Sequence, residues 1–414
     1  MANVSSSNGL EKRPKLRFPG FDEPWKATAF GDLVHEFSER TKEEDEDTLL
    51  SAAIEGMFLN TELFGHQRGA SNKGYKKIRY GTMVLSTQNL HLGNANVNQR
   101  FEHGMVSPAY KTYDITGCSV DLIAQWIKSE AAKRFFYNAT TVGASVCRRN
   151  VEWDTLYEQP LYLPCLDEQE KIAEFLALLS DRINKQQQFV SALKKYKRGL
   201  SDALFAHIAQ SSDCVIVKFG EAFELLQNNT FSREELTDIP SSVQNIHYGD
   251  VLIKYGAVVN IATDVPPYIK PSNDLQRFSR TSYLRDGDVV FADTAEDYSV
   301  GKATEIAGVN GVSVLSGLHT IPCRSFKKFQ PMYLGYYFNS SLFREQIYPL
   351  VQGTKVSSIS KGELAKVSVH IPNEDDQRRI TSMLYSMDLR IVHEERKVEA
   401  LTDARAAFLQ QLFI

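Results

Sequence analysis

Two stretches of the chain place apolar residues at alternating steps of four and three along the sequence. That spacing is typical of a helix whose apolar seam packs against a partner helix in a coiled coil. The seam of the first stretch consists of Ile172, Leu176, Leu179, Ile183, Gln186, Val190, Leu193, Lys197, Leu200 and Leu204. The seam of the second stretch consists of Ile380, Leu384, Met387, Ile391, Glu394, Val398, Leu401, Arg405, Phe408 and Leu412. We therefore predict two coiled-coil helices of about 40 residues, each about 60 Å long at a rise of 1.5 Å per residue.

The two stretches are copies of one unit. Residues 163–205 align without gaps with residues 371–413 at a constant offset of 208, and twelve of the 43 positions are identical. The identities include Pro164/Pro372, Gln169/Gln377, Ile172/Ile380 and Arg182/Arg390. Polar residues also occupy the same two seam positions, Gln186/Glu394 and Lys197/Arg405. Matched polar breaks in an apolar seam suggest a specified register or a specified partner.

The repeat extends upstream of the helices. Residues 25–32 resemble residues 215–221 at an offset of 189, so each unit contains a globular head followed by a long helix. The second head is the longer one, since the offset grows from 189 to 208. The predicted segments are the first head with its N-terminal tail over 1–162, a helix over 163–209, the second head over 210–370 and a helix over 371–414.

The heads show mixed patterns of strand and helix. The first has β-like runs at 80–87 and 161–164 and a helical pattern at 119–138, and the second has β-like runs at 247–258, 285–297 and 311–323 and a helical pattern at 331–350. We predict an α/β (α+β) protein in which two mixed heads are separated by two long antiparallel coiled-coil helices with pseudo-two-fold symmetry. In the alternative arrangement each helix packs only on its own head, for which a shorter helix would suffice.

Composition narrows the class of protein. An apolar fraction of 43% and a charged fraction of 24% are typical of a folded globular chain. The sequence lacks the roughly 18 consecutive apolar residues of a membrane helix and lacks a signal peptide, so we expect a cytoplasmic protein without a membrane partner. The five cysteines never form a CxxC pair, which argues against a sulfur-ligated zinc site. The net charge of −4 means that any nucleic-acid surface must be a local patch.

One basic run is the best candidate for such a patch. Residues 66–80 contain five cations and no acid, and they interleave the cations with tyrosine and glycine: Arg68, Lys73, Lys76, Lys77 and Arg79. Lysine and arginine beside exposed backbone suit contacts to DNA phosphates, although a solvated surface loop would have the same composition. Further candidates lie in the segments before the helices and across the second head: Arg148, Arg149, Lys355, Lys361, Lys254, Lys270, Arg277, Arg280 and Arg285. The acidic stretch 36–47 is expected to face away from DNA.

Catalytic motifs are absent from the sequence. It contains no GxxxxGK[ST] loop, GxGxxG loop, (N/D)PP(Y/F) tetrad, HExxH pair or GxSxG elbow. Asp288, Asp293 and Asp297 share one segment, but we interpret them as turn and surface carboxylates because no basic or metal-binding companion accompanies them. We therefore predict no catalytic residue, no metal and no cofactor in this chain.

Several of these segments together resemble the specificity subunit of Type I restriction–modification systems. The resemblance lies in the opening PKLRFPGFDEPWKATAFGD, in the LPCLDEQEKIA start of the first helix, in its IPNEDDQRRI echo, and in the helix endings ALF and QLF. It covers nearly the whole chain. The second helix start departs from the family pattern at residues 373–376, which leaves the seam unchanged.

The resemblance implies a division of labour among subunits. Each head would read one half of a bipartite, asymmetric site in double-stranded DNA, and the helices would set the gap between the halves. Two methyltransferase subunits would dock on the helices, and translocase/nuclease subunits would join for cleavage. These partners would carry the S-adenosylmethionine, ATP and Mg. The expected spacer and partner interface comprises Gln169, Ile172, Leu176, Leu179, Ile183, Val190, Leu193, Leu204, Gln377, Ile380, Leu384, Ile391, Val398, Leu401 and Leu412.

Two alternatives differ in class. A coiled-coil scaffold whose heads bind proteins would show no salt-dependent affinity for DNA. An enzyme with an unrecognised site in one head would show catalysis by the isolated chain.

Overall fold

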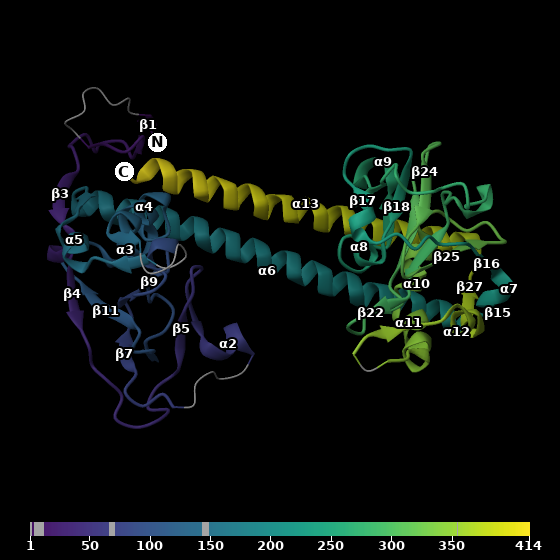
Figure 1. The fold of residues 1–414 in the computed structure, drawn as a ribbon, viewed down its shortest axis with the longest axis horizontal. Helices are drawn as coiled ribbons and strands as arrows, with labels where there is room; N and C mark the ends of the chain where they lie inside the picture. Colours follow the sequence, from purple (N-terminus) through teal and green to yellow (C-terminus); the bar gives the residue numbers. More distant parts are fainter. Residues whose placement is uncertain (1, 4–11, 66–70, 143–148, 354) are drawn as a thin grey trace. The chain divides into compact units, whose positions relative to one another are not determined.

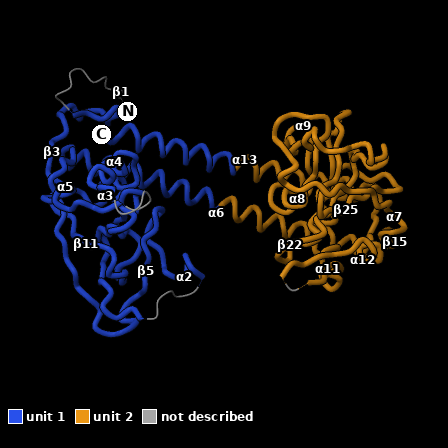
Figure 2. Tube along the Cα trace, viewed as in Figure 1, with its two compact units in different colours: residues 1–188, 395–414 blue, residues 189–394 orange. Residues whose placement is uncertain are grey.

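The chain forms two compact units joined by its long helices. The computed structural model describes residues 2–3, 12–65, 71–142, 149–353 and 355–414. One unit is Met1–Gln188 with Glu395–Ile414, hereafter unit 1, and the other is Phe189–Glu394, hereafter unit 2 (Figure 2). Each unit holds one head and parts of both long helices, α6 (Leu166–Gln210) and α13 (Glu374–Leu412). The predicted pair of long helices is confirmed, and each begins two residues after the proline that the repeat shares.

The head of unit 1 is built on an antiparallel sheet with strand order β4-β11-β8-β9. Its elements, some of which are labelled in Figure 1, are β1 (Ala2–Asn3), β2 (Leu16–Arg17), β3 (Lys26–Ala29), α1 (Phe30–Leu33), β4 (Val34–Phe37), β5 (Leu50–Ala52), β6 (Met57–Leu59), α2 (Asn60–Phe64), β7 (Lys76–Arg79), β8 (Met83–Ser86), η1 (Leu90–Leu92), β9 (Ala95–Val97), β10 (His103–Val106), β11 (Tyr110–Ile115), α3 (Val120–Trp126), α4 (Glu130–Asn138), β12 (Thr140–Val142), β13 (Arg149–Val151), α5 (Trp153–Glu158) and β14 (Pro160–Leu163). Buried apolar residues of the sheet and of α3 and α4 form one core with Ile172, Leu176 and Leu412 of the long helices. The head is thus packed onto the helix pair, which positions the two parts of the unit against each other.

The head of unit 2 contains a larger sheet, with strand order β16-β25-β21-β23-β19, and a second sheet, β17-β20-β18-β24. Its elements are β15 (Val215–Lys218), α7 (Phe219–Ala222), β16 (Phe223–Leu225), η2 (Arg233–Glu235), β17 (Leu236–Thr237), β18 (Val243–Ile246), α8 (Tyr248–Ile253), β19 (Val258–Asn260), α9 (Ile261–Asp264), β20 (Tyr268–Ile269), η3 (Arg280–Ser282), β21 (Val289–Ala292), β22 (Thr294–Ala295), β23 (Ala303–Ala307), β24 (Ser313–Ser316), β25 (Thr320–Ser325), α10 (Tyr333–Phe338), α11 (Ser341–Ile347), η4 (Tyr348–Leu350), β26 (Ser357–Ser358), α12 (Lys361–Lys366) and β27 (Ser368–Ile371). Here too the core includes long-helix residues, among them Phe205, Ile380 and Leu384.

The two heads share one frame, as the repeat predicts. In unit 1 the frame is β3-α1-β4, followed at the end of the head by α5 and β14, and in unit 2 it is β15-α7-β16, followed by α12 and β27. β14 pairs antiparallel with β3, and β27 pairs in the same way with β15, so each head closes on itself where its long helix starts. A glycine sits in the first short helix of each frame because the neighbouring helix approaches closely. A Cβ on Gly31 would lie 3.0 Å from Tyr157 Cβ, and one on Gly220 would lie 3.4 Å from Ala365 Cβ.

Three details of the heads differ from the prediction. The stretch 247–258 is not a strand but begins with helix α8, whose first turn is capped by His247, since its Nδ1 accepts the N–H of Gly249 at 3.2 Å. The predicted helix at 119–138 is two helices, because Ser129 starts α4 by accepting a hydrogen bond from the N–H of Ala132. The predicted helix at 331–350 is likewise divided between α10 and α11.

The seam of the long helices follows the predicted spacing. Every predicted seam residue is buried or half-buried. Within unit 1 the helices run antiparallel, since the rings of Phe175 and Phe408 lie 5.0 Å apart and Ser180, further along α6, contacts Arg405, further back on α13. Across the described residues, no helix has both the length and the apolarity that membrane crossing requires.

Candidate nucleic-acid interface

The start of each long helix is tied to its head by the glutamine that the repeat shares. In unit 1 the side-chain oxygen of Gln169 accepts the N–H of Ser119 at 2.8 Å, and its Nε2 donates to the carbonyl of the proline five residues earlier. In unit 2 Gln377 accepts the N–H of Gln330 at 2.9 Å and donates to the corresponding proline carbonyl. Because Ser119 and Gln330 lie just before α3 and α10, the glutamine fixes the same helix of each head against the long helix.

The cation in the seam of unit 2 forms a polar junction. The ammonium of Lys197 on α6 pairs with the carboxylate of Asp388 on α13 and lies 5.2 Å from the ring centre of Tyr336 on α10. The hydroxyl of Tyr336 donates to the other oxygen of Asp388 at 2.7 Å. Burial, with the neighbouring carboxylate, raises the pKa of Tyr336, so this hydroxyl keeps its proton and remains a donor.

Unit 1 has the equivalent junction with other side chains. Arg405, which is Lys197 plus 208, donates from Nε to Ser180 Oγ at 2.8 Å and from Nη2 to Gln125 Oε1 at 2.9 Å. Ser180 is the counterpart of Asp388 at the same offset, and Gln125 on α3 takes the place of Tyr336 on α10. Burial lowers the pKa of Arg405. Since both junctions join α6, α13 and a head helix, these seam cations set the register of the helices within each unit.

The predicted spacer and partner positions are mostly enclosed by the chain itself. Ten are buried, namely Gln169, Ile172, Leu176, Ile183, Val190, Gln377, Ile380, Leu384, Ile391 and Leu412, and five are half-buried, namely Leu179, Leu193, Leu204, Val398 and Leu401. Sequence reasoning missed the large apolar side chains that the long helices leave exposed: Leu166, Leu178, Phe189, Tyr196, Met383, Tyr385, Leu389 and Val392. The signal for them was present, since they are apolar residues outside the seam.

The basic run of unit 1 is only partly available to a ligand. Arg68 lies outside the described residues, and Lys73 is exposed. Lys76 begins β7 and is 6% exposed, and burial lowers its pKa. A lysine at a buried strand position supports the head, whereas Lys73 is free to meet solvent or a ligand.

Acidic side chains neutralise the remainder of this run. Lys77 pairs with Glu46 at 2.5 Å and with Glu39 at 3.7 Å, and the hydrogen bond from Lys77 lowers the pKa of Glu46 to about 2. Arg79 pairs with Asp114 at 2.6 Å. The acidic stretch 36–47, expected to face away from DNA, therefore contacts the basic run.

The candidates before the long helices are dispersed. Arg148 lies outside the described residues, and Arg149 packs its guanidinium 4.2 Å from the ring centre of Tyr137. Lys355 and Lys361 are exposed, and Lys361 donates to an asparagine side chain at 3.3 Å.

The structure brings together two of the candidates in the second head. All five predicted cations there are exposed: Lys254, Lys270, Arg277, Arg280 and Arg285. Hydrogen bonds from Ser232 lower the pKa of Glu235, and the charges of Lys270 and Arg277 lower it further, so these two cations lie near one carboxylate. The guanidinium of Arg277 also rests 5.1 Å and 5.0 Å from the ring centres of Phe231 and Phe278.

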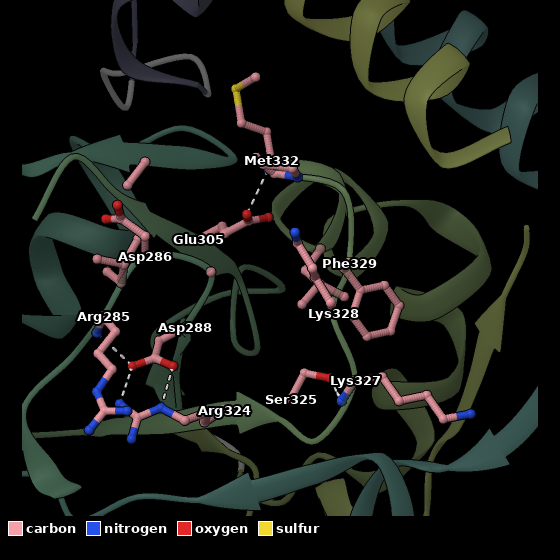
Figure 3. Close-up of a pocket in the computed structure, with 15 residues that line it drawn as sticks. Arg285, Asp286, Asp288, Glu305, Arg324, Ser325, Lys327, Lys328, Phe329 and Met332 are labelled. Atoms are coloured by element: carbon pink, nitrogen blue, oxygen red, sulfur yellow. Dashed lines mark hydrogen bonds and ion pairs between the residues drawn. The ribbon is translucent and has the colours of Figure 1, made fainter. Parts of the chain in front are cut away.

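A pocket of about 380 Å³ in unit 2 contains two buried carboxylates (Figure 3). Asp288 pairs with Arg324 at 2.6 Å and is buried. The interpretation of Asp288 as a surface carboxylate was therefore wrong. Glu305 accepts the N–H groups of Met332 and Gly335 at 2.6 Å and 2.9 Å, and burial raises its pKa to about 7. Both carboxylates therefore make contacts within the head of unit 2. The part of the chain that the structure describes contains no group of three or more His, Cys, Asp or Glu side chains able to hold a metal ion.

The chain is similar to a solved chain from the type I restriction–modification system, from work on its complex assembly and conformational transition, with a TM-score of 0.59 and 15% identity over 96% of this chain and 99% of that one. The fold is that of a type I restriction–modification chain. The fold class and the resemblance inferred from the sequence are therefore confirmed at the level of the fold.

Two further solved structures are similar to this type I fold. One is the S subunit of the type I restriction–modification system from M. genitalium, with a TM-score of 0.49, 13% identity, and coverage of 97% of this chain and 99% of that one. The other is the HsdS subunit from Thermoanaerobacter tengcongensis, with a TM-score of 0.48, 16% identity, and coverage of 97% and 98%. No family model and no curated protein matches the chain.

Proposed function

We propose that this chain is the DNA specificity subunit of a type I restriction–modification complex, and that each head reads one half of a bipartite, asymmetric site. The observation that carries the proposal is the duplicated frame. Two heads close on themselves in the same way, through β14 with β3 and through β27 with β15, and each continues into a long helix. Because the frame is repeated, the chain would present two DNA-reading surfaces of the same kind to one DNA duplex.

Differences between the heads support unequal half-sites. Unit 2 adds the sheet β17-β20-β18-β24 and a fifth strand to its main sheet, while the frame next to the helices is unchanged. Two exposed cations of unit 2 lie in this added region, since Lys270 follows β20 and Arg277 precedes η3. Phosphate contacts from such cations position a protein on DNA, and different loops on one frame then read different bases.

The long helices supply a docking surface for other subunits. Eight large apolar side chains on them are exposed, and Tyr196 is 63% exposed. Exposed apolar side chains on one element are typical of a protein–protein interface. We assign this surface to two methyltransferase subunits, which would supply S-adenosylmethionine, and we expect translocase/nuclease subunits with ATP and Mg to join them. This chain itself would be non-catalytic.

Salt-dependent DNA binding by the assembled complex tests the proposal. The complex of this chain with its methyltransferase partner should bind duplex DNA with an affinity that falls steeply as salt rises, because lysine and arginine contacts release counterions. The isolated chain should transfer no methyl group. Binding that is indifferent to salt, or absent, would favour a protein-binding scaffold, and methylation by the isolated chain would show an enzyme.

A further inference from the structure

A cavity of about 570 Å³ in unit 2 has an unusual concentration of positive charge. It lies beside α6 and is lined by five cationic side chains, Lys194, Lys197, Arg198, Lys302 and Arg344. The acidic side chains in its lining are Asp202 and Glu345. The chain as a whole carries a net charge of −4, so this concentration is local and opposite in sign.

Arg344 is the most constrained of the five cations. It is 9% exposed, its Nη2 donates to the carbonyl of Tyr298 at 2.6 Å, and its guanidinium lies 5.2 Å from the ring centre of Tyr348. Its Nη1 is buried and has no hydrogen-bond acceptor among the described residues. A buried guanidinium N–H without an acceptor is costly and calls for an explanation. A bound anion would accept a hydrogen bond from this N–H, and the neighbouring cations would also attract it.

The packing of the lysines differs from one to the next. Lys302 donates to the carbonyl of Leu252 at 2.8 Å, and burial lowers its pKa, with the charge of Arg344 adding to the effect. Lys197 belongs to the polar junction of unit 2, where it pairs with Asp388. Arg198 is exposed, and within the described ranges it makes no ion pair. It is therefore the cation in the lining that is most available to a ligand.

Comparison of the two repeats shows which cations of the cavity are also required by the shared frame. Lys197 has its counterpart in Arg405, and both hold the helices in register. The counterparts of Lys194 and Arg198 at the offset of 208 are Thr402 and Ala406, which carry no charge. Packing of the duplicated frame therefore does not require these two cations, and they belong to the second unit alone.

The chemistry of the lining selects a phosphate. Arginine presents several N–H donors in a planar fork that matches phosphate oxygens, and lysine adds a mobile point charge. The hydroxyls of Ser201 and Ser299 also line the cavity. Its volume exceeds that of a single phosphate and accommodates one with the sugars attached on either side.

We propose that this cavity binds a backbone phosphate of the DNA duplex. The proposal rests on the proposed function, which supplies DNA as the source of the phosphate. A contact of this kind adds affinity and orientation and carries no base information.

Arg198→Gln is the variant that tests it, because this exposed side chain makes no hydrogen bond or ion pair in the described part of the chain. Lys195→Gln is the matched control, since Lys195 is exposed on the same helix but does not line the cavity. The measurement is the DNA affinity of the assembled complex at salt concentrations between about 50 and 200 mM. We expect the slope of log affinity against log salt to become shallower by about 0.9 in Arg198→Gln, to stay unchanged in Lys195→Gln, and the modified DNA motif to stay the same in both.

The other outcomes separate the causes of failure. If the wild-type complex binds DNA with a steep slope and Arg198→Gln leaves that slope unchanged, the cavity does not hold a DNA phosphate. Calorimetric titration of the full chain with inorganic phosphate then distinguishes the sources. Phosphate binding that Arg198→Gln abolishes, with an unaltered DNA slope, would assign the cavity to a small phosphate compound and overturn the DNA proposal. A wild-type complex without salt-dependent DNA binding would overturn the proposed function itself, and the DNA assignment with it.

Discussion

Replacing Arg405 with methionine removes the polar junction of unit 1 and tests whether seam cations hold the head to the helices. The change deletes the hydrogen bonds to Ser180 Oγ and to Gln125 Oε1 and places an apolar side chain at this seam position. A hydrogen bond from a charged donor contributes about 1.5–3 kcal/mol, and the buried oxygen of Gln125 also loses its donor. Ser180 keeps its bond to the carbonyl of Leu176. We therefore expect unit 1 to lose roughly 3 kcal/mol of unfolding free energy.

The three tryptophans make the assay specific to this unit. Trp25, Trp126 and Trp153 all belong to unit 1, and Trp126 follows Gln125 directly on α3. Urea unfolding followed by tryptophan fluorescence should show a lower midpoint at an unchanged slope. The matched control is Arg396→Met, an exposed arginine on the same helix, which should change the unfolding free energy by less than about 0.5 kcal/mol.

A double-mutant cycle decides between a specific bond and general loss of packing. Combining Arg405→Met with Gln125→Met should cost less than the sum of the single changes, by about 1 kcal/mol or more, because the second change removes a group already unpaired. Costs that add to within about 0.5 kcal/mol would refute the junction.

Three further predictions follow from the fold. Burial raises the pKa of Glu305 to about 7 from its ordinary value of 4.5, so the stability that its protonated form supplies is complete below about pH 4.5 and is lost as pH rises through about 7. Between pH 5 and 8, chemical denaturation of wild type relative to Glu305→Gln should show a loss of about 2–3 kcal/mol, and a relative gain would contradict the shift. Gly31→Ala should destabilise unit 1 by about 1–3 kcal/mol through overpacking, and Gly220→Ala, with its wider 3.4 Å approach, should cost unit 2 less; equal or negligible costs in separate unfolding measurements would show that the close approach is unimportant. Matched seven-residue insertions after Val190 and after Glu394 lengthen each helix by about 10 Å, the rise of about three base pairs. Methylation mapping should therefore show both half-sites retained and the gap between them longer by about three base pairs, and an unchanged gap would show that the helices do not set it.

The long helices were predictable because their signal is local and repeated. Alternating steps of three and four identified the buried seam, and the shared prolines with acidic residues after them marked where α6 and α13 begin. The polar breaks at Lys197 and Arg405 were predicted as a register or partner signal, and the structure shows them holding the register within each unit. The tyrosine and glutamine that complete these junctions come from the heads, far away in sequence.

The candidate nucleic-acid surface was less predictable because charge in a sequence does not reveal partners in space. Lys77 reads as a free cation in its own segment, but Glu46 neutralises it from 31 positions away. Lys76 is buried because its side chain points inward from β7. The composition of the segment does not predict on which side of a strand a side chain lies. The cavity beside α6 gathers cations from α6, from the loop before β23 and from α11, so it could not be found before the fold was known.

Base-resolved methylation mapping tests the central claim most directly. This chain would be co-expressed with its methyltransferase subunit in a host free of DNA methylation, and the modified bases would be sequenced. The account predicts a new split motif of two half-sites with a fixed gap, absent when this chain is omitted. A soluble, assembled complex that modifies no new motif, or one that modifies the same motif without this chain, would contradict it.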